Sequence, residues 1–281
     1  MKVPSVVEML QAGVHFGHQV SRWHPKMEEY IFTERNGVHV IDLERTREEL
    51  EKVLKSVHDL AADGKQILFI TTKPQAREIV RNAAVDCGMP YLVERWIGGL
   101  ITNFPEMKKL FKKYVSLKDQ QASGELERYT KHEQVKIIKG LEKMEKNLSG
   151  IAYLEKMPDA LFVPSLQCEK TAVNEANRVG VPIIGICDTN ANPDKADFVI
   201  PANDDAVNSI KMMVELVAEA IKEGRAEYEK KASIVKDTAE KGRKISDKNK
   251  EEKKSQPKAG QPQAEKKEKD KEKDRRGLDW N

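Results

Sequence analysis

The chain has 281 residues, of which 39% are hydrophobic and 34% are charged, so it can bury a core and still carries more charge than most soluble domains. The formal net charge of +3 is unevenly spread, because residues 229–281 hold 18 Lys and Arg against 12 Asp and Glu, whereas residues 1–228 hold 31 against 34. A uniformly basic domain is therefore excluded, and any nucleic-acid contact must come from local basic patches.

The sequence shows no sign of a membrane or secretory protein. No apolar run approaches the length of a membrane span, and the start MKVPSVVEMLQAG has no signal-peptide pattern. The three cysteines, Cys87, Cys168 and Cys187, lie far apart and form no CxxC pair. This usage predicts buried free thiols in a reducing, cytoplasmic compartment.

The first 42 residues predict small local elements. Pro4 and Ser5 begin a short helix that Gly13 ends. A loop rich in His, Trp and basic residues follows. Residues 30–42 then predict a β-hairpin, because Asn36-Gly37 stands between two apolar runs and both positions tolerate positive φ.

From Leu43 onwards, short apolar strands alternate with helices. Strands are predicted at residues 67–70, 91–93, 160–163, 182–187 and 198–200, and helices at residues 43–63, 75–87, 172–179 and 205–224. Continuous apolar strands separated by helices are typical of a parallel sheet that is covered on both faces. With right-handed crossovers, the pattern predicts a three-layer α/β/α, doubly wound sheet of about five strands.

Residues 104–148 interrupt this alternation, because they contain two helical apolar stripes and no strand signal. Ser123-Gly124 predicts a turn between the stripes, and Thr130 with Glu133 predicts a capping box at the start of the second helix. We predict an antiparallel coiled-coil hairpin inserted into an α/β domain of residues 1–103 and 149–228. Residues 229–281 have few apolar side chains and are predicted to be disordered or a fraying helix.

The common signatures of enzymes built on this fold are missing. The sequence has no GxxxxGK[ST], no GxGxxG after a strand and no GxSxG. Gly98-Gly99 follows a predicted strand and could approach a phosphate, but a tight turn into the hairpin explains the pair more simply. We predict that the chain is not an enzyme. The alternative, a cofactor-binding enzyme, needs a pocket near Asp188 and Gly98-Gly99, and a third hypothesis is a protein-interaction scaffold that uses the hairpin.

Histidine and aspartate residues in the sequence could bind a metal ion. A structural role for the chain would not require one. The Asp residues follow predicted strand ends, where sites gather in this fold, and nitrogen and oxygen ligands suit a divalent ion such as zinc or magnesium. The candidate ligands are His15, His18, Asp188, Asp204 and Asp205. Hydrogen bonds that stabilise the loops are the simpler explanation of the same residues, and no cofactor is required.

Basic and aromatic residues gather at three places in the sequence. One group lies within residues 22–35, a second follows the strand at residues 67–70, and Arg95-Trp96 follows the next strand. Lys and Arg neutralise phosphates, and aromatic rings stack on unpaired bases. Alternatively, Trp23 and Trp96 are partly buried anchors with ordinary charged neighbours, so these residues alone leave the function open.

Seven ordered motifs carry a resemblance to a known family. They are AGVHFGH (12–18), RWHPKMEEYIFTERNGVHVIDLERT (22–46), TKPQA (72–76), CGMPYLVERWIGGLITNF (87–104), MPDALFVPS (157–165), VGVPIIGICDTNANPD (179–194) and VIPANDDAVNSI (199–210). In these motifs the chain resembles the bacterial-type small-subunit ribosomal protein S2 family, uS2. The resemblance extends from Met1 to about Gly224 and leaves out the Lys- and Glu-rich tail.

The resemblance implies a non-catalytic protein that binds small-subunit ribosomal RNA near the junction of head and body. It also implies a role in late assembly, and in recruiting the large OB-repeat ribosomal protein one, which captures messenger RNA for initiation. Neighbouring ribosomal proteins are expected partners; a membrane and a homo-oligomer are not. With this resemblance, the hypothesised RNA-binding residues are Arg22, Trp23, Lys26, Arg35, Lys73, Arg77, Arg95, Trp96, Asn103, Lys108, Lys109, Lys112 and Lys113.

Overall fold

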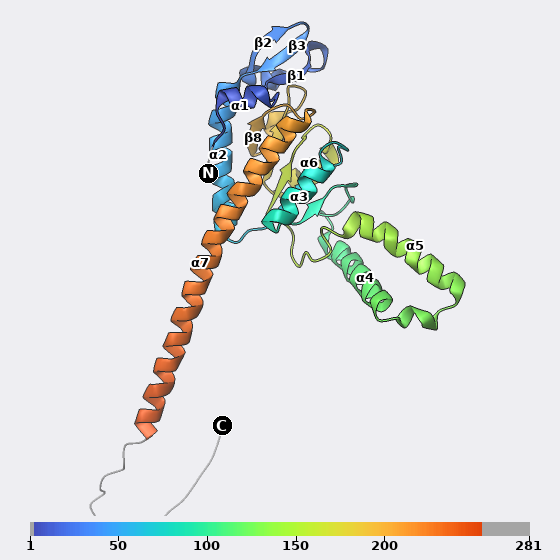
Figure 1. Ribbon diagram of the computed structural model, residues 1–281, viewed down its shortest axis with the longest axis vertical. Coiled ribbons are helices and arrows are strands. Elements are labelled where there is room, and N and C mark those ends of the chain that lie inside the picture. The colour runs from blue at the N-terminus through green and yellow to red at the C-terminus, as the bar shows by residue number, and fades with distance from the viewer. Residues whose placement is uncertain (1–2, 255–281) are drawn as a thin grey trace, which may run out of the picture. The chain divides into compact units, whose positions relative to one another are not determined.

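The computed structural model describes the backbone of residues 3–254 and the side chains of residues 3–231. The chain divides into two compact units, residues 1–232 and residues 233–281. Both sheets and all helices up to α6 belong to the first unit (Figure 1). No described helix is both long and apolar enough to cross a bilayer.

A small antiparallel sheet forms near the N-terminus. Helix α1 (Val6–Gln11) is capped by Ser5, whose side chain forms a capping box with Glu8. Strands β1 (Phe16–Gln19), β2 (Ile31–Arg35) and β3 (Val38–Ile41) follow, in the order β1-β3-β2. The hairpin prediction is confirmed, because Asn36 has φ 54° and Gly37 has φ 74° in the turn. Strand β1 was not predicted, since this segment was expected to be a loop.

The second sheet has five parallel strands, in the order β5-β4-β6-β7-β8. Its strands are β4 (Ile67–Ile70), β5 (Tyr91–Leu92), β6 (Ala160–Val163), β7 (Ile183–Cys187) and β8 (Phe198–Pro201). The predicted parallel sheet of about five strands is confirmed. Every residue of β4, β6 and β7 is buried, which explains why their sequences are continuously apolar.

Helices cover both faces of this sheet. Phe69 and Phe162 meet edge to face, with ring centroids 5.0 Å apart, in a core shared with α2 (Leu43–Ala62), α3 (Arg77–Cys87) and the N-terminal part of α7 (Val207–Lys254). The alternate strand residues Leu68 and Leu161 face a second core, shared with α6 (Lys170–Val179). The period of two along each strand thus divides one apolar run between two cores.

Two helices lie between β5 and β6 in chain order. They are α4 (Phe104–Ala122) and α5 (Lys131–Leu148), joined by a 3-10 turn, Glu125–Arg128, and they run side by side (Figure 1). Phe111 and Tyr114 of α4 share the second core with Leu141 of α5, and Lys118 pairs with Glu145 at 2.9 Å. The capping box of Thr130 and Glu133 is present as predicted. That these helices form a coiled coil stays a prediction.

The last helix differs from its predicted length. Helix α7 begins at Val207 and continues to Lys254, beyond the predicted end near Gly224. Gly224 does not end the helix, because it sits where α7 crosses α2 closely: a Cβ there would lie 2.4 Å from the His58 carbonyl oxygen. The Lys- and Glu-rich sequence that follows has good helix propensity. Of the tail predicted from residue 229, residues 255–281 lie outside the described residues.

Candidate functional site

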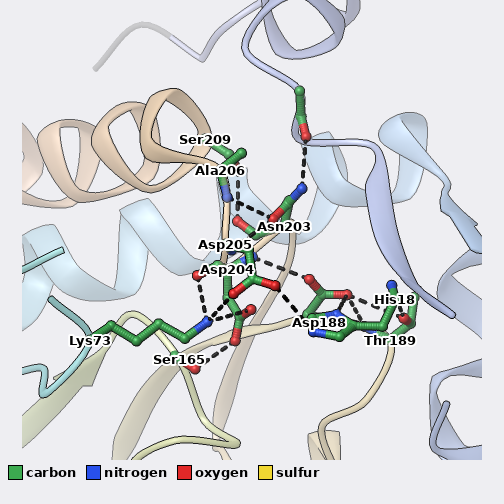
Figure 2. Close-up of polar contacts among 11 residues, drawn as sticks. His18, Lys73, Ser165, Asp188, Thr189, Asn203, Asp204, Asp205, Ala206 and Ser209 are labelled. Carbon is green, nitrogen blue, oxygen red and sulfur yellow. Dashed lines mark hydrogen bonds and ion pairs between the residues drawn. The ribbon is translucent and has the colours of Figure 1, made fainter. Parts of the chain in front are cut away.

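The polar residues of the candidate site follow the carboxyl ends of four strands. Chain connections leave β4 towards β5 on one side, and β6 towards β7 on the other, so the strand order reverses between β4 and β6. In open α/β sheets, ligands bind in the crevice outside this reversal point. The residues that follow the strand ends here are Thr72, Lys73, Ser165, Asp188, Asp204 and Asp205, and most of them meet in one network (Figure 2).

Lys73 lies at the centre of this network. Its Nζ is 2.7 Å from Asp204 Oδ1 and 2.8 Å from Asp205 Oδ1, and it also donates to the Asp204 carbonyl oxygen at 2.7 Å. Ser165 Oγ donates to the second oxygen of Asp204 at 2.5 Å. The side chain of Lys73 is only 11% exposed. The ammonium group is therefore largely enclosed by carboxylates.

Burial and pairing act in opposite directions on these groups. Burial works to lower the pKa of Lys73, but attraction to Asp204 and the hydrogen bonds raise it overall. Burial, with repulsion from Asp188, raises the pKa of Asp204. Asp205 is more exposed; burial works to raise its pKa, but the Lys73 hydrogen bond and charge hold it below the ordinary value. The Lys73 ammonium thus lies between two carboxylates whose pKa values are shifted in opposite directions.

His18 ties the small N-terminal sheet to this edge of the large sheet. Its Nδ1 lies 3.1 Å from Asp188 Oδ1, and its Nε2 lies 3.2 Å from Asp205 Oδ2. The hydrogen bond with Asp188 raises the pKa of His18 more than burial lowers it. The backbone N–H of His18 also donates to Thr189 Oγ1 at 2.9 Å, and Asn203 Nδ2 donates to the Gly13 carbonyl oxygen at 3.3 Å.

Three of the five predicted metal ligands can meet on one ion. One ligand atom from each of His18, Asp188 and Asp204 lies within 4.8 Å of the other two. Asp205 lies next to this group, because its carboxylate pairs with both His18 and Lys73. His15 does not join the group; its ring packs on Phe16, with centroids 4.0 Å apart.

A buried carboxylate lies next to the end of β4. Glu169, which is 3% exposed, accepts hydrogen bonds from the backbone N–H and the hydroxyl of Thr72. Burial raises the pKa of Glu169. Glu169, Lys73 and Ser165 thus bind partners within the chain at these strand ends. The cofactor-enzyme alternative needs one pocket near both Asp188 and Gly98, and none of the five pockets described for this chain is lined by both residues.

A second carboxylate organises the loop between β5 and α4. Glu175 of α6 accepts hydrogen bonds from Trp96 Nε1 at 3.0 Å and from the Gly99 N–H at 2.9 Å. Longer hydrogen bonds of 3.2–3.4 Å come from Ile101 N and from both Thr102 N and Thr102 Oγ1. Burial works to raise the pKa of Glu175, but these donors lower it overall. Sequence reasoning missed this residue, because a single Glu on a helix carries no signal.

The hypothesised RNA-binding residues fall into two groups. Several already have partners within the chain: Lys26 pairs with Asp194, Lys73 with Asp204 and Asp205, Arg77 with Glu94, and Lys109 with Glu106, while Lys108 donates to the Glu155 carbonyl oxygen. Trp96 is 8% exposed and Trp23 is half-buried against His39. Both rings are therefore at least partly buried anchors, which is the alternative that the sequence left open for Trp23 and Trp96.

The second group is exposed and makes no ion pair with a described residue. It consists of Arg22, Arg35, Arg95, Lys112 and Lys113. Asn103 is also exposed, at the start of α4. These cations lie in four separate segments of the chain, with Lys112 and Lys113 both on α4, and their role in RNA binding stays a prediction.

Comparison with known proteins gives one consistent result. A family model described as "Ribosomal protein S2" matches residues 9–224. A curated relative, "Small ribosomal subunit protein uS2" of Coprothermobacter proteolyticus, is 44% identical over 225 residues, which cover 80% of this chain and 84% of that protein. The matched range contains both sheets, α4 and α5, and the network around Lys73.

Proposed function

The chain belongs to the ribosomal protein S2 family, whose members are structural proteins and not enzymes, and from this premise we propose that it binds ribosomal RNA as a constituent of the small ribosomal subunit. The observation that carries the proposal is the 44% identity to a small-subunit protein over 225 residues. We further propose that it acts in the cytoplasm, within a bacterial-type subunit, and contributes to its late assembly.

The exposed cations support this proposal physically. Arg22, Arg35 and Arg95 come from three separate segments, and their charge is not compensated within the described part of the chain. Phosphate contacts fix the position of a protein on RNA without reading sequence, so scattered cations on a rigid domain suit recognition of folded RNA by shape. About six such contacts would make the logarithm of affinity fall with the logarithm of salt concentration with a slope of about −5.

Sedimentation tests the proposal directly. A tagged copy of the full chain is expected to co-migrate with small subunits through a sucrose gradient, in amounts near those of other subunit proteins. Filter binding to purified small-subunit RNA between 50 and 200 mM salt is expected to weaken steeply. Migration only as a free protein, or an RNA affinity that does not change with salt, would contradict the proposal. Association that survives high salt but needs α4 and α5 intact would favour the interaction-scaffold hypothesis.

We also propose that the N-terminal sheet contributes to recruiting the OB-repeat ribosomal protein one. Phe16 is 54% exposed and Phe32 is 72% exposed, on β1 and β2, and Leu10 of α1 is 52% exposed. A contiguous exposed apolar surface is typical of protein contacts, whereas single exposed apolar side chains are ordinary, so the proposal rests on these three side chains acting as one surface. In a pull-down with the purified OB-repeat protein, Phe32→Ser should reduce capture, whereas Tyr153→Ser, at a residue 78% exposed outside this sheet, should not. Equal capture by both variants would contradict this role.

A divalent ion at His18, Asp188 and Asp204 is a further proposal, supported by the spacing of their ligand atoms. Two carboxylates and an imidazole suit zinc or magnesium. Such an ion would compete with the Lys73 ammonium, which contacts Asp204 Oδ1. Calorimetric titration with Zn²⁺ and with Mg²⁺ should show one site in the natural chain that is lost in Asp188→Asn. The same heat in both proteins, or none in either, would overturn this proposal.

A further inference from the structure

A pocket of about 380 Å³ lies between the β5–α4 loop and the facing sides of α4 and α5. Its volume is within the range of about 300–1,000 Å³ that is typical of small-molecule sites. Ile97, Leu110 and Met144 give it an apolar surface, and Asn147 adds a carboxamide. Two cations, Arg95 and Lys143, also line it.

The charge of this pocket sets it apart from four other hollows formed by the described residues. Each of those four includes at least one carboxylate among its lining residues, for example Asp119, Asp86, Glu8 or Glu48. The lining of the pocket at Ile97 has two cations and no carboxylate. Neither Arg95 nor Lys143 forms an ion pair with another described residue, so both charges remain available to an anion.

One wall of the pocket is held in place before any ligand arrives. Trp96 and Gly98 line that wall. The Trp96 indole donates to Glu175 at 3.0 Å, and Gly99 N, one residue beyond Gly98, donates to the same carboxylate at 2.9 Å. A preorganised wall lowers the entropy that binding must overcome.

We propose that this pocket binds one unpaired nucleotide of RNA, with its base on the apolar surface at Ile97 and Met144 and its phosphates between Arg95 and Lys143. The proposal rests on the proposed function and names one contact within it. A nucleotide combines a flat apolar face with an adjacent anion, and the pocket combines the complementary groups. Unpaired bases that leave the stack are the usual targets of specific RNA recognition by proteins.

The glycines of this region allow a matched pair of variants. A Cβ at Gly98 would meet no atom within 4 Å, and Gly98 lines the pocket, so Gly98→Leu places an apolar side chain at the pocket wall. Gly140 of α5 is equally open and does not line the pocket, so Gly140→Leu is the control. For the charge, Lys143→Gln is compared with Lys139→Gln, one turn away on the same helix and outside the pocket lining.

Binding of the full-length chain to purified small-subunit RNA tests the inference. Gly98→Leu should weaken binding about ten-fold, the size of one base stacked on an apolar surface, while Gly140→Leu leaves it unchanged. Lys143→Gln should also weaken binding more than Lys139→Gln does. In 4-thiouridine-labelled RNA, the cross-linked peptide should include residues 95–98 in the natural chain and not in Gly98→Leu.

The outcomes distinguish failure of RNA binding by the chain from failure of nucleotide binding by the pocket. If the natural chain does not bind the RNA, the proposed function itself fails. If it binds but Gly98→Leu and Gly140→Leu bind equally well, RNA binding stands and the nucleotide pocket is overturned. Loss of another ribosomal protein from subunits carrying Gly98→Leu, with unchanged RNA affinity, would assign the pocket to a protein and also overturn the proposal. Circular dichroism spectra matching the natural chain establish that each variant is folded.

Discussion

Replacing Glu175 by Ala tests whether this carboxylate holds the β5–α4 loop. The substitution removes the acceptor for Trp96 Nε1 and for Gly99 N, at 3.0 and 2.9 Å, and for three longer hydrogen bonds at 3.2–3.4 Å from Ile101 and Thr102. A hydrogen bond to a charged group contributes about 1.5–3 kcal/mol when buried. Because Glu175 is only half-buried, we count about 1 kcal/mol for each short bond and about 1 kcal/mol for the three longer ones together.

We therefore expect Glu175→Ala to lower the free energy of unfolding by about 2–3 kcal/mol. Urea denaturation followed by circular dichroism measures this difference. The control is Glu78→Ala, because Glu78 is an exposed residue of α3 with no side-chain hydrogen bond or ion pair to a described residue. A loss below about 0.5 kcal/mol, the usual range for surface substitutions, would refute the view that Glu175 organises the loop.

Three further predictions follow from the same structure. Because the folded pKa of Glu175 is lowered, its contribution to stability should be full above about pH 5 and lost as the pH falls through the folded pKa; a gap between the natural chain and Glu175→Gln that does not change from pH 7 to pH 3 would contradict this. Gly224→Ala should destabilise the fold by about 1–3 kcal/mol, because the added Cβ would meet the backbone of α2. Gly140→Ala, in an open helical position, should stabilise the fold by about 0.5–1 kcal/mol. Shifts of the same sign in the thermal unfolding of the two variants would rule out this reasoning. Lys73→Met leaves the buried Asp204 without its cation and should cost about 3 kcal/mol in urea denaturation; a cost below about 1 kcal/mol would be inconsistent with the ion pair described.

The large sheet could be predicted closely from the sequence, and the small one only in part. Strands β4 and β6 coincide with their predicted residues, because a buried parallel strand must be apolar at every position. Strand β1, with the sequence FGHQ, shows no such pattern. It forms because β3 and Thr189 supply its hydrogen-bond partners, and these partners are distant in the sequence.

The candidate site could also be predicted only in part from the sequence. The carboxylates were predicted from their places after strand ends, where the fold brings them together. From the sequence alone, Lys73 is predicted to contact RNA phosphates. Its actual partner, Asp204, lies 131 residues away, so no neighbouring residue in the sequence reveals the ion pair. Glu175 was missed for the same reason, since its five donors lie 73–79 residues away.

The attachment of β1 to Thr189 also constrains the order in which the chain folds during its own synthesis. His18 and its partner Thr189 are 171 residues apart. At a translation rate of about 5–20 residues per second, the small sheet waits roughly 10–30 seconds for its anchor to be made. Until then, β1 lacks the Thr189 hydroxyl that accepts the His18 backbone N–H. Chains that stop before Asp188 are thus expected to keep an unanchored N-terminal segment, and closure of the domain depends on its longest-range contacts.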